Sequence, residues 1–425
     1  MTDRWTPRAV PALDGFASPA RSHTPGTRLR VAVVLGTRPE AIKLAPVVRE
    51  LERRADVFAP LVVATAQHRE MLAQALDAFG LRPDVDLGLM REGQTPGDFL
   101  ARAIEAVGDC LRRLAPDVVL VQGDTSTVLA AALAAVYERI PVGHVEAGLR
   151  SFNVRSPFPE ELNRRLATAA SELHFAPTWS ARQNLLAEGI AEDRVFVTGN
   201  TVVDALAMTP RKAAFDDPAL DRVPWGARRV ILVTVHRGEN LGAPLAGVCA
   251  AIRELVRGHA DVHVVLPVHL NPAVRDVVRA ELGDVPRVTL LEPIGHSDFL
   301  EAARRSTFVM TDSGGVQEEC PSLGRAVLIL RENTERPEVV DAGFGRLVGT
   351  DATFVASAAS RLLDDPAALH AMSSGRNPFG DGLAARRIVD VLARRLAGVN
   401  DGPAIPEFAV GDRLVAGGVA GGSAG

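Results

Sequence analysis

The chain has 425 residues, more than one typical hydrophobic core organises, so we expect two domains. Its formal net charge is −5, and no overall basic field favours nucleic acid as a partner. Hydrophobic residues make up 47% of the chain, as in ordinary globular proteins, but no apolar run approaches the ~18 residues of a membrane-spanning helix.

The three cysteines, Cys110, Cys249 and Cys320, are isolated in the sequence and odd in number. This pattern argues against a disulfide framework and against a zinc site made of cysteines, and it favours a reducing compartment. We therefore expect a cytoplasmic protein with no membrane and no nucleic acid as partner. Each cysteine is expected to be a small buried side chain.

The two ends of the chain differ in composition from the rest. Residues 1–28 contain Pro, Ser, Arg and Thr without a hydrophobic segment of the signal-peptide type. Residues 398–425 finish in a Gly/Ala tail that cannot build a core. We expect a disordered leader over 1–28 and a disordered tail over 398–425.

The first unit predicted from the sequence is a strand over 30–35, a polar turn and a helix. Pro39 suits the first turn of that helix. Arg38 and Lys43 then lie near the carboxyl end of the strand, where doubly wound sheets bind their ligands. Each can also be an ordinary charge that faces solvent, and Lys43 is the weaker of the two candidates.

Three further apolar runs, each followed by polar residues, predict buried strands. His68 follows the first run and is more often a structural hydrogen bonder than a ligand. Asp124 follows the second run at the start of a helix, where it can simply be the N-cap. Glu146 follows the third. The runs cover 61–64, 118–121 and 141–145.

Glu160 and Arg164 are four residues apart in a predicted helix, so they share one helical face. One interpretation of this spacing is a surface ion pair. The other places a carboxylate and its guanidinium partner in a ligand-binding cleft.

A domain boundary is expected near 198–210, because residues 211–228 are charged and spaced by prolines. A second series of strand–helix units follows, and its strands lead to polar segments that contain His236, His269 and Phe299. The predicted domains are 29–198 with a last helix near 384–397, and 199–383.

A glycine turn, Asp312-Ser313-Gly314-Gly315, separates an apolar strand from a short helix. Paired glycines permit positive φ and close approach of the backbone, and Ser313 can cap the helix. Free amides at a helix start bind anions. We interpret the turn as the holder of a diphosphate, with Glu319 binding a ribose and Arg336 adding positive charge. The alternative is an ordinary strand, turn and helix with a solvated start.

The repeated alternation of strands and helices predicts two doubly wound, Rossmann-like parallel α/β domains. If the two sheets face each other, their strand-to-helix loops lie across one central cleft, which suits a nucleotide sugar. No G-x-G-x-x-G fingerprint supports NAD, and no histidine or carboxylate spacing supports a metal site.

Ten ordered motifs, spread over about residues 29 to 397, resemble those of the non-hydrolysing UDP-N-acetylglucosamine 2-epimerases. Any one of them is weak evidence, but so many in the same order make chance similarity implausible. The motifs are GTRPEAIKLAPV (36–47), TAQHREML (65–72), GDTST (123–127), GHVEAGLRS (143–151), PFPEELNR (157–164), TGNTVVDAL (198–206), HRGEN (236–240), PVHLNP (267–272), TDSGGVQEE (311–319) and TERPE (334–338).

The resemblance implies a two-domain fold of the GT-B type, with UDP bound by the C-terminal domain, and a homodimer. It implies interconversion of UDP-GlcNAc and UDP-ManNAc. In the family, UDP leaves C1 as the C2 proton is lost, which gives a 2-acetamidoglucal, and UDP adds back after a proton returns on the other face. No nicotinamide, metal or other cofactor takes part.

The resemblance also assigns roles to individual residues. The catalytic cluster consists of Asp124, Glu146, Glu160, Arg164 and His236. The substrate-binding residues are Arg38, Lys43, Phe299 near uracil, Ser313, Gly314, Gly315, Glu319 on the ribose and Arg336. The residues of a second, allosteric UDP-GlcNAc site are Gln67, His68 and His269.

Three other functions remain open at this point. A hydrolysing epimerase shares the fold and most motifs, but it releases ManNAc and UDP. A GT-B glycosyltransferase shares the fold. A catalytically dead nucleotide-sugar sensor is a different class of protein, and the intact catalytic cluster argues against it.

Overall fold

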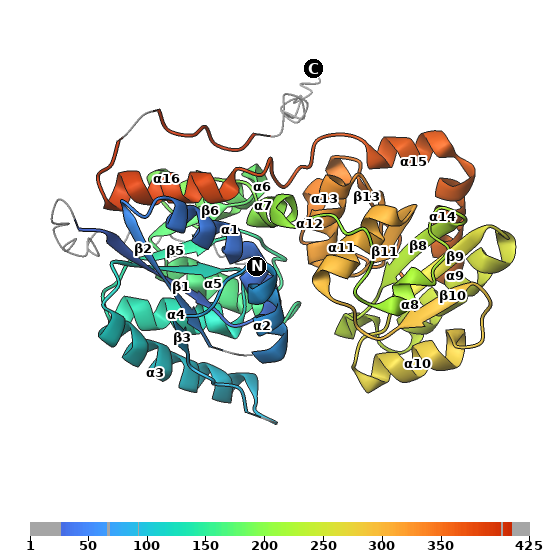
Figure 1. Ribbon diagram of the computed structural model, residues 1–425, viewed down its shortest axis with the longest axis horizontal. Coiled ribbons are helices and arrows are strands. Elements are labelled where there is room, and N and C mark those ends of the chain that lie inside the picture. The colour runs from blue at the N-terminus through green and yellow to red at the C-terminus, as the bar shows by residue number, and fades with distance from the viewer. Residues whose placement is uncertain (1–26, 66–68, 92, 401–402, 410–425) are drawn as a thin grey trace, which may run out of the picture. The chain divides into compact units, whose positions relative to one another are not determined.

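The computed structural model describes residues 27–65, 69–91, 93–400 and 403–409. The chain divides into two compact units. In Figure 1 the colour follows the residue number, so each unit can be found from the residue ranges given next. Unit 1 comprises Met1–Met208 and Phe379–Gly425, and unit 2 comprises Thr209–Pro378. None of the described helices combines the length and apolarity that a membrane-crossing segment needs.

Unit 1 is built on a seven-stranded parallel sheet with the order β3-β2-β1-β4-β5-β6-β7. The chain reverses its direction of winding between β1 and β4, and ligands bind at such a switch point in doubly wound sheets. The strands are β1 (Leu29–Leu35), β2 (Phe58–Ala64), β3 (Val85–Asp86), β4 (Val118–Gln122), β5 (Val142–Val145), β6 (Leu173–Ala176) and β7 (Val195–Val197). The helices are α1 (Arg38–Arg53), α2 (Arg69–Ala78), α3 (Pro96–Leu114), α4 (Ser126–Tyr137), α5 (Glu160–Ala170), α6 (Trp179–Ala187), η1 (Glu192–Arg194), α7 (Thr201–Met208) and α16 (Ala384–Leu396).

β1 shows why an uninterrupted apolar run forms the centre of this sheet. Val31 and Val33 pack into the core that includes side chains of α1 and α16, whereas Ala32 and Val34 pack into the core on the other face with α3 and α4. Because successive side chains of a strand point to opposite faces, a strand covered on both sides must be apolar throughout. Each fully buried valine stabilises the unit by roughly 1.5–3 kcal/mol.

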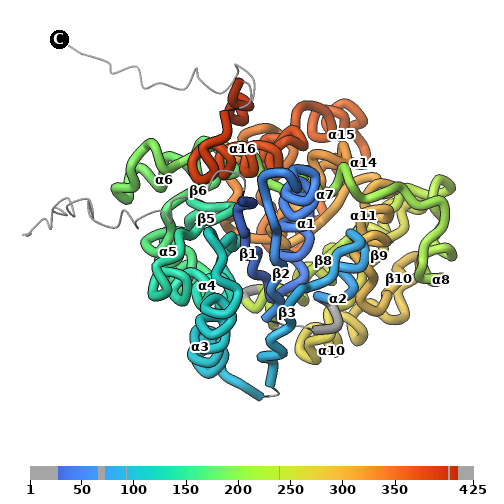
Figure 2. The backbone as a smooth tube through the Cα atoms, turned by 60° about the vertical axis from the view of Figure 1, so that its left-hand side comes forward, coloured from blue at the N-terminus to red at the C-terminus, as the bar shows by residue number. Residues whose placement is uncertain are grey.

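Helix α7 belongs to unit 1, although residues 199–208 fall in the second of the two predicted domains. It packs against α1 and α16, and the backbone views show it beside these helices (Figures 1 and 2). Asp204 of α7 caps α16 by accepting the amides of Ala384 (3.2 Å) and Ala385 (2.9 Å). The units therefore divide after residue 208 and again after residue 378.

Residues 403–409, within the tail that is predicted to be disordered, form an extended segment on unit 1. The amide of Phe408 donates to the carbonyl of Val197 (2.9 Å), and Trp179 Nε1 donates to the carbonyl of Phe408 (3.1 Å). The Phe408 side chain is buried. The buried Phe408 ring, the hydrogen bond from its amide to β7 and the one from Trp179 hold this segment, and a composition argument detects none of them.

Unit 2 is built on a six-stranded parallel sheet with the order β10-β9-β8-β11-β12-β13, and its switch point lies between β8 and β11. The strands are β8 (Arg229–Thr234), β9 (Val262–Pro267), β10 (Val288–Leu291), β11 (Phe308–Thr311), β12 (Val327–Ile329) and β13 (Gly345–Leu347). The helices are α8 (Pro218–Asp221), η2 (Gly238–Asn240), α9 (Ala243–Gly258), α10 (Pro272–Leu282), α11 (His296–Arg305), α12 (Gly314–Glu319), η3 (Cys320–Leu323), α13 (Pro337–Asp341), α14 (Ala352–Asp364) and α15 (Pro366–Ser373).

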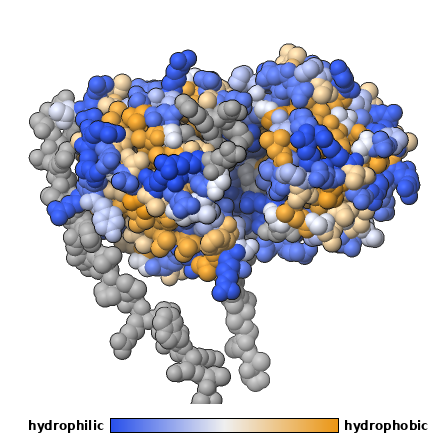
Figure 3. All heavy atoms as spheres, turned by 90° about the horizontal axis from the view of Figure 1, so that it is seen from below, coloured by the Kyte–Doolittle hydropathy of each residue, from blue (hydrophilic) through white to orange (hydrophobic). Residues whose placement is uncertain are grey.

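The three cysteines are free and buried, as predicted. Burial raises the pKa of the Cys249 thiol to about 12, so this group is an inert part of the core. Hydrophilic and apolar residues both contribute to the outer surface (Figure 3), and the exposed apolar side chains include Phe152 and Phe158, which precede α5.

Candidate active site

The loop from β1 to α1 is fixed by Glu40, a wholly buried carboxylate in the first turn of the helix. It accepts the amides of Gly36 (2.7 Å) and Thr37 (2.6 Å) and the hydroxyl of Thr37 (2.9 Å). It also accepts the hydroxyl of Thr125, and thereby joins this loop to the one after β4. Burial raises the pKa of Glu40, and these hydrogen bonds oppose the rise. Glu40 thus positions the two loops of the switch point.

Lys43 and Glu146 form a buried ion pair beside these loops. Each side chain is about 8% exposed. Glu146 also accepts Gln122 Nε2 (3.0 Å) and Asn200 Nδ2 (2.8 Å), so side chains from three separate parts of the chain orient one carboxylate. The backbone of Glu146 is left-handed, with a φ of 65°. Lys43 does not face solvent, and that alternative from the sequence is wrong.

Asp124 follows β4 and pairs with Arg164 of α5. Asn163 Nδ2 donates to the backbone carbonyl of Asp124 (3.0 Å), which fixes the loop from the same helix. The N-cap of α4 is Thr125, whose hydroxyl accepts the amide of Val128 (3.3 Å). The N-cap alternative for Asp124 is therefore wrong, and its carboxylate is directed at a guanidinium instead.

The pairing expected between Glu160 and Arg164 is not formed. Arg164 pairs with Asp124 and with Glu161, whose Oε2 lies 3.3 Å from its Nη1. Glu161 is fully buried, and it accepts the amide of Ser151 (2.9 Å) as well. Glu160 is partly exposed in the first turn of α5. Spacings of three and four residues both place side chains on one helical face, so the sequence alone does not separate the two partners.

His144 of β5 holds the backbone that carries Asp124. Its Nε2 donates to the carbonyl of Gly123 (2.7 Å), and Gly123 has a φ of 83°. Burial lowers the pKa of His144 to about 4, so the ring is neutral near pH 7. The sequence does not indicate a role for His144, because nothing in the GHVEAG motif shows where its side chain points.

In unit 2, the corresponding switch point carries His236 and Asp312. Asp312 is wholly buried, and His236 Nδ1 lies 3.1 Å from its Oδ1. The His236 ring stacks on the ring of His269, with 5.9 Å between centroids and 23° between planes. Burial, and then the positive charge of His236, lower the pKa of His269. The predicted catalytic and allosteric histidines are thus neighbours.

The glycine turn forms the predicted strand, turn and short helix, but its local contacts differ from the prediction. Ser313 occupies the N-cap position of α12 without a side-chain capping bond, because the hydrogen bond here runs from its amide to Thr311 Oγ1 (2.9 Å). Neither Gly314 nor Gly315 has a positive φ. A Cβ at Gly314 would lie 2.5 Å from Cζ of Arg336, so this glycine makes room for the guanidinium.

Arg336 is held by two carboxylates next to the turn. Its Nε donates to Glu318 Oε1 (2.7 Å), and its Nη1 lies 3.5 Å from Glu335 Oε2. Glu335 also pairs with the buried Arg331 (2.8 Å). Burial raises the pKa of Glu335, but the hydrogen bond from Arg331 and the two guanidinium charges outweigh it and hold the pKa at about 2. The position of Arg336 is therefore fixed before any ligand binds.

The remaining predicted residues that the structure describes lie on α1, α11 and α12. Arg38 is exposed in the first turn of α1. Glu319 Oε1 lies 3.2 Å from Nε2 of His296, the first residue of α11, and Phe299 follows on the same helix, half-buried. Gln67 and His68 lie outside the described residues.

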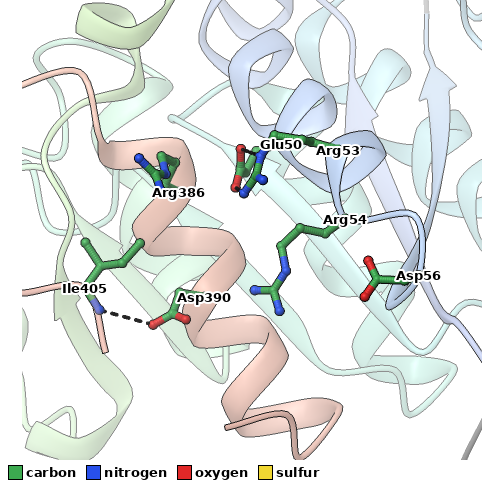
Figure 4. Close-up of a pocket in the computed structure, with 7 residues that line it drawn as sticks. All are labelled: Glu50, Arg53, Arg54, Asp56, Arg386, Asp390 and Ile405. Atoms are coloured by element: carbon green, nitrogen blue, oxygen red, sulfur yellow. Dashed lines mark hydrogen bonds and ion pairs between the residues drawn. The ribbon is translucent and has the colours of Figure 1, made fainter. Parts of the chain in front are cut away.

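A surface cavity of about 330 Å³ lies elsewhere in unit 1, at the C-terminal end of α1 and beside α16 (Figure 4). Its three arginines are balanced by three carboxylates, so it has no net charge to attract an anion. It lies at the opposite end of α1 from Arg38 and Lys43. The cavity is lined by Glu50, Arg53, Arg54, Asp56, Arg386, Asp390 and Ile405.

The described residues contain no group of three or more His, Cys, Asp or Glu side chains arranged to hold a metal ion. What the two switch points do contain is carboxylates, guanidinium groups, one ammonium group and imidazoles at fixed positions. Such groups transfer protons and bind anions.

Comparison with known proteins gives a consistent result. A family model described as UDP-N-acetylglucosamine 2-epimerase matches residues 49–393. A UDP-N-acetylglucosamine 2-epimerase of Bacillus subtilis (strain 168) is 51% identical over 365 residues, which are 86% of this chain and 95% of that protein.

Solved structures agree with the sequence matches. The structure of S. aureus MnaA with UDP has a TM-score of 0.83 and 43% identity, and the match covers 90% of this chain and 100% of that chain. The UDP-GlcNAc 2-epimerase of Neisseria meningitidis, bound to UDP-GlcNAc, has a TM-score of 0.80 and 41% identity over 86% and 100% of the two chains. The predicted fold class, two doubly wound α/β domains of the GT-B type, is confirmed. The chain belongs to the UDP-N-acetylglucosamine 2-epimerase family.

Proposed function

We propose that this protein is a non-hydrolysing UDP-GlcNAc 2-epimerase that interconverts UDP-GlcNAc and UDP-ManNAc. Family membership supports the activity, and the Neisseria relative binds UDP-GlcNAc. The observation that carries the proposal is that Asp124 and Glu146, which follow the neighbouring strands β4 and β5, are each paired with a cation. Positioned carboxylates at this place are what the removal of a proton from a sugar carbon requires.

The proposed reaction is an elimination followed by the reverse addition. A carboxylate removes the C2 proton, the electron pair of that bond forms a C1–C2 double bond, and the C1–O bond breaks to release UDP. A proton then returns to the opposite face of C2 in the 2-acetamidoglucal, and UDP adds back at C1. No atom is oxidised or reduced in the sum, so the sequence of steps needs no electron acceptor.

Inversion at C2 needs proton exchange on two faces, and we assign it to Asp124, Glu146 and Glu160. Glu146 is oriented by Gln122 and Asn200, and a neighbouring ammonium group stabilises its negative charge. Asp124 has the corresponding partner in Arg164. Glu160 is partly exposed and therefore accessible to a substrate.

The departing UDP carries negative charge, which must be stabilised for the C1–O bond to break. We assign this role to Arg38, to Arg336 and to the backbone at Ser313, Gly314 and Gly315, with His236 at the diphosphate. Arg336 is preorganised by Glu318 and Glu335, so its ordering costs nothing at the moment of reaction. Glu319 is assigned to the ribose and Phe299 to uracil.

We further propose that His269 belongs to an allosteric UDP-GlcNAc site together with Gln67 and His68, and that the protein is a cytoplasmic homodimer. The stacking of His269 on His236 supports the first of these proposals, because a ligand at His269 would then contact a catalytic side chain. Light scattering on the full chain tests the dimer. Activation by added UDP-GlcNAc in the reverse reaction tests the second site.

Incubation with UDP-GlcNAc in deuterated water, followed by NMR, tests the proposed function. UDP-ManNAc with deuterium at C2 is the expected product. Stoichiometric free ManNAc would instead show the hydrolysing reaction. Unlabelled substrate would show that the chain is a GT-B transferase or a nucleotide-sugar binding protein without this chemistry.

A further inference from the structure

We propose that Asp312 is a positioning residue that sets the tautomer and orientation of the His236 imidazole, so that Nδ1 carries a proton and Nε2 is presented to the substrate. The sequence indicates Asp312 only as the first residue of the glycine turn, without a contact to His236. The purpose assigned to it rests on the function proposed above, because that function makes His236 a catalytic side chain.

The first support is the backbone around Asp312. Asp312 directly follows β11, which pairs with β8, and its own amide donates to the carbonyl of Thr234 at the end of β8 (3.2 Å). Its carboxylate in turn accepts the amides of His236 and Arg237, each at 2.9 Å from Oδ2. The carboxylate thus fixes the backbone at His236 and Arg237.

The second support is Asn240, which closes the same loop from the other side. Its Nδ2 donates to Asp312 Oδ2 (2.9 Å) and to the carbonyl of Leu330 (3.1 Å), and the side chain is buried. Oδ2 of Asp312 is therefore occupied by three donors. Oδ1 is the oxygen that lies near the imidazole, and the three hydrogen bonds at Oδ2 keep the carboxylate from rotating away from the ring.

The third support is the contact with the ring itself. His236 Nδ1 lies 3.1 Å from Oδ1, and an ionised carboxylate only accepts hydrogen bonds, so Nδ1 must be the donor. Burial raises the pKa of Asp312, but the hydrogen bonds from His236 and Arg237 outweigh it and the pKa is lowered, so the group is ionised at neutral pH. The His236 side chain is 36% exposed whereas Asp312 is fully buried, which leaves Nε2 as the accessible nitrogen.

This arrangement has a chemical consequence for the departing UDP. A carboxylate at Nδ1 holds the ring in one tautomer and one orientation. Once Nε2 takes up a proton, it donates a hydrogen bond to an anionic oxygen. His269, stacked on the face of the ring, restricts its plane as well.

The variant Asp312→Asn gives a sharp test, because an amide has one acceptor and one donor end. The three donors at Oδ2 require the amide oxygen there, so the NH2 group would face Nδ1 of His236. The ring would then have to accept at Nδ1 and carry its proton on Nε2. The same exchange of tautomer underlies the loss of activity when the Asp of a Ser-His-Asp triad becomes Asn.

NMR of the 15N-histidine-labelled full chain measures this directly, with the His236 signal assigned by its absence in His236→Asn. We expect a proton on Nδ1 in the native protein and on Nε2 in Asp312→Asn. The same tautomer in both proteins would overturn the inference. This readout needs no turnover, so it decides the role of Asp312 even if the proposed epimerase activity is absent.

Asp298→Asn is the matched control for the NMR experiment. Asp298 is also a buried carboxylate of unit 2 that accepts backbone amides, those of Asp216 (3.1 Å) and Asp217 (2.9 Å), but it pairs with Lys212 and not with a histidine. We expect the native His236 tautomer in this variant. A change of tautomer there as well would show a general loss of structure and would count against a specific role of Asp312.

A double-mutant cycle with His236→Asn tests whether Asp312 acts through the ring. We expect Asp312→Asn to lower kcat by roughly 100-fold or more with a smaller change in KM, and the double variant to be no slower than His236→Asn alone. Losses that multiply in the double variant would contradict the inference, because they would mean that Asp312 acts independently of His236. Thermal unfolding of all three variants identifies any that fail to fold.

Discussion

At the scale of single residues, Glu146 combines a strained backbone conformation with three side-chain contacts to its carboxylate. A non-glycine residue with a φ of 65° costs on the order of 1–3 kcal/mol, and such strain persists only where surrounding contacts determine it. Here Lys43, Gln122 and Asn200 all contact the same carboxylate. The strained turn aims the side chain at one place, which is what a base for a weakly acidic proton needs.

We expect Asp124→Asn, Glu146→Gln and Glu160→Gln each to lower turnover by more than ~100-fold, because positioned acid and base groups contribute at least that much. Steady-state kinetics with UDP-GlcNAc measures the loss. Near-normal turnover in all three variants would remove the assigned chemistry.

Variants of the Lys43–Glu146 ion pair distinguish a stabilising role of Glu146 from a catalytic role. Glu146→Gln leaves a buried ammonium without its partner, which costs roughly 3–5 kcal/mol, whereas the double variant Lys43→Met/Glu146→Gln removes both charges. We expect the double variant to recover most of the lost stability in thermal unfolding and none of the turnover. Recovery of turnover along with stability would show that Glu146 is only structural.

Glu160 and Glu161 are adjacent but are predicted to differ in role. Glu161 is fully buried and holds Arg164, Arg165 and the amide of Ser151, so Glu161→Gln should lower the unfolding temperature. Glu160→Gln should leave that temperature unchanged while turnover falls. Kinetics and thermal unfolding of the two variants, side by side, test this assignment. The reverse pattern would move the catalytic role to Glu161.

At the scale of elements, Gly314 and Gly315 at the start of α12 offer a matched pair of variants. A Cβ at Gly314 would lie 2.5 Å from the Arg336 guanidinium, whereas a Cβ at Gly315 meets nothing within 4 Å. We therefore expect Gly314→Ala to displace Arg336, with a lower unfolding temperature and weaker UDP binding by calorimetry. Gly315→Ala should not lower the unfolding temperature. Equal destabilisation by both would mean that the displaced guanidinium is not the cause.

His144 of β5 and His174 of β6 lie opposite each other in the sheet. Because both rings are buried, we expect the stability of unit 1 to depend on pH. Burial lowers the pKa of His144 to about 4 and that of His174 to about 3, against an ordinary value of 6.5. Below pH 6.5 the unfolded chain binds protons that the native rings do not bind, so acid favours unfolding. The stability that depends on the neutral rings is present above pH 6.5 and is lost as the pH falls toward 4.

Acid unfolding followed by circular dichroism measures this dependence. We expect the free energy of unfolding to fall between pH 6.5 and 4 in the native protein, and to fall less steeply in His144→Gln, which keeps an amide donor for the carbonyl of Gly123. If the free energy of unfolding falls with the same slope in both proteins, protonation of His144 on unfolding does not cause the pH dependence.

The sequence predicted the elements better than it predicted the contacts between them. Hydrophobic periodicity identifies β1 and the other central strands, because a strand covered on both faces must be apolar. It also places Asp124 and Glu146 at the ends of neighbouring strands. It does not identify Glu40, His144 or Asp312, because their partners are distant in sequence and become neighbours only in the sheet.

At the scale of the whole molecule, unit 2 is one continuous stretch of chain with its own core. We expect a fragment of residues 209–378 to fold and to bind UDP, because the residues proposed for the diphosphate, the ribose and uracil include Arg336, Glu319 and Phe299. Calorimetric titration of the fragment with UDP tests this expectation, with Arg336→Ala as the control. A cooperatively folded fragment without affinity for UDP would place the nucleotide site elsewhere.

Unit 1, in contrast, consists of two separate stretches, and the cap that Asp204 provides for α16 joins them. Helix α7 is the last element before the chain leaves unit 1, and α16 is the first after it returns. The points at which the chain leaves and re-enters unit 1 therefore lie close together, an arrangement in which domain insertions are tolerated. Unit 1 therefore needs only a short connection between α7 and α16 to close its chain, and we expect another domain inserted in place of residues 209–378 to leave the fold of unit 1 intact.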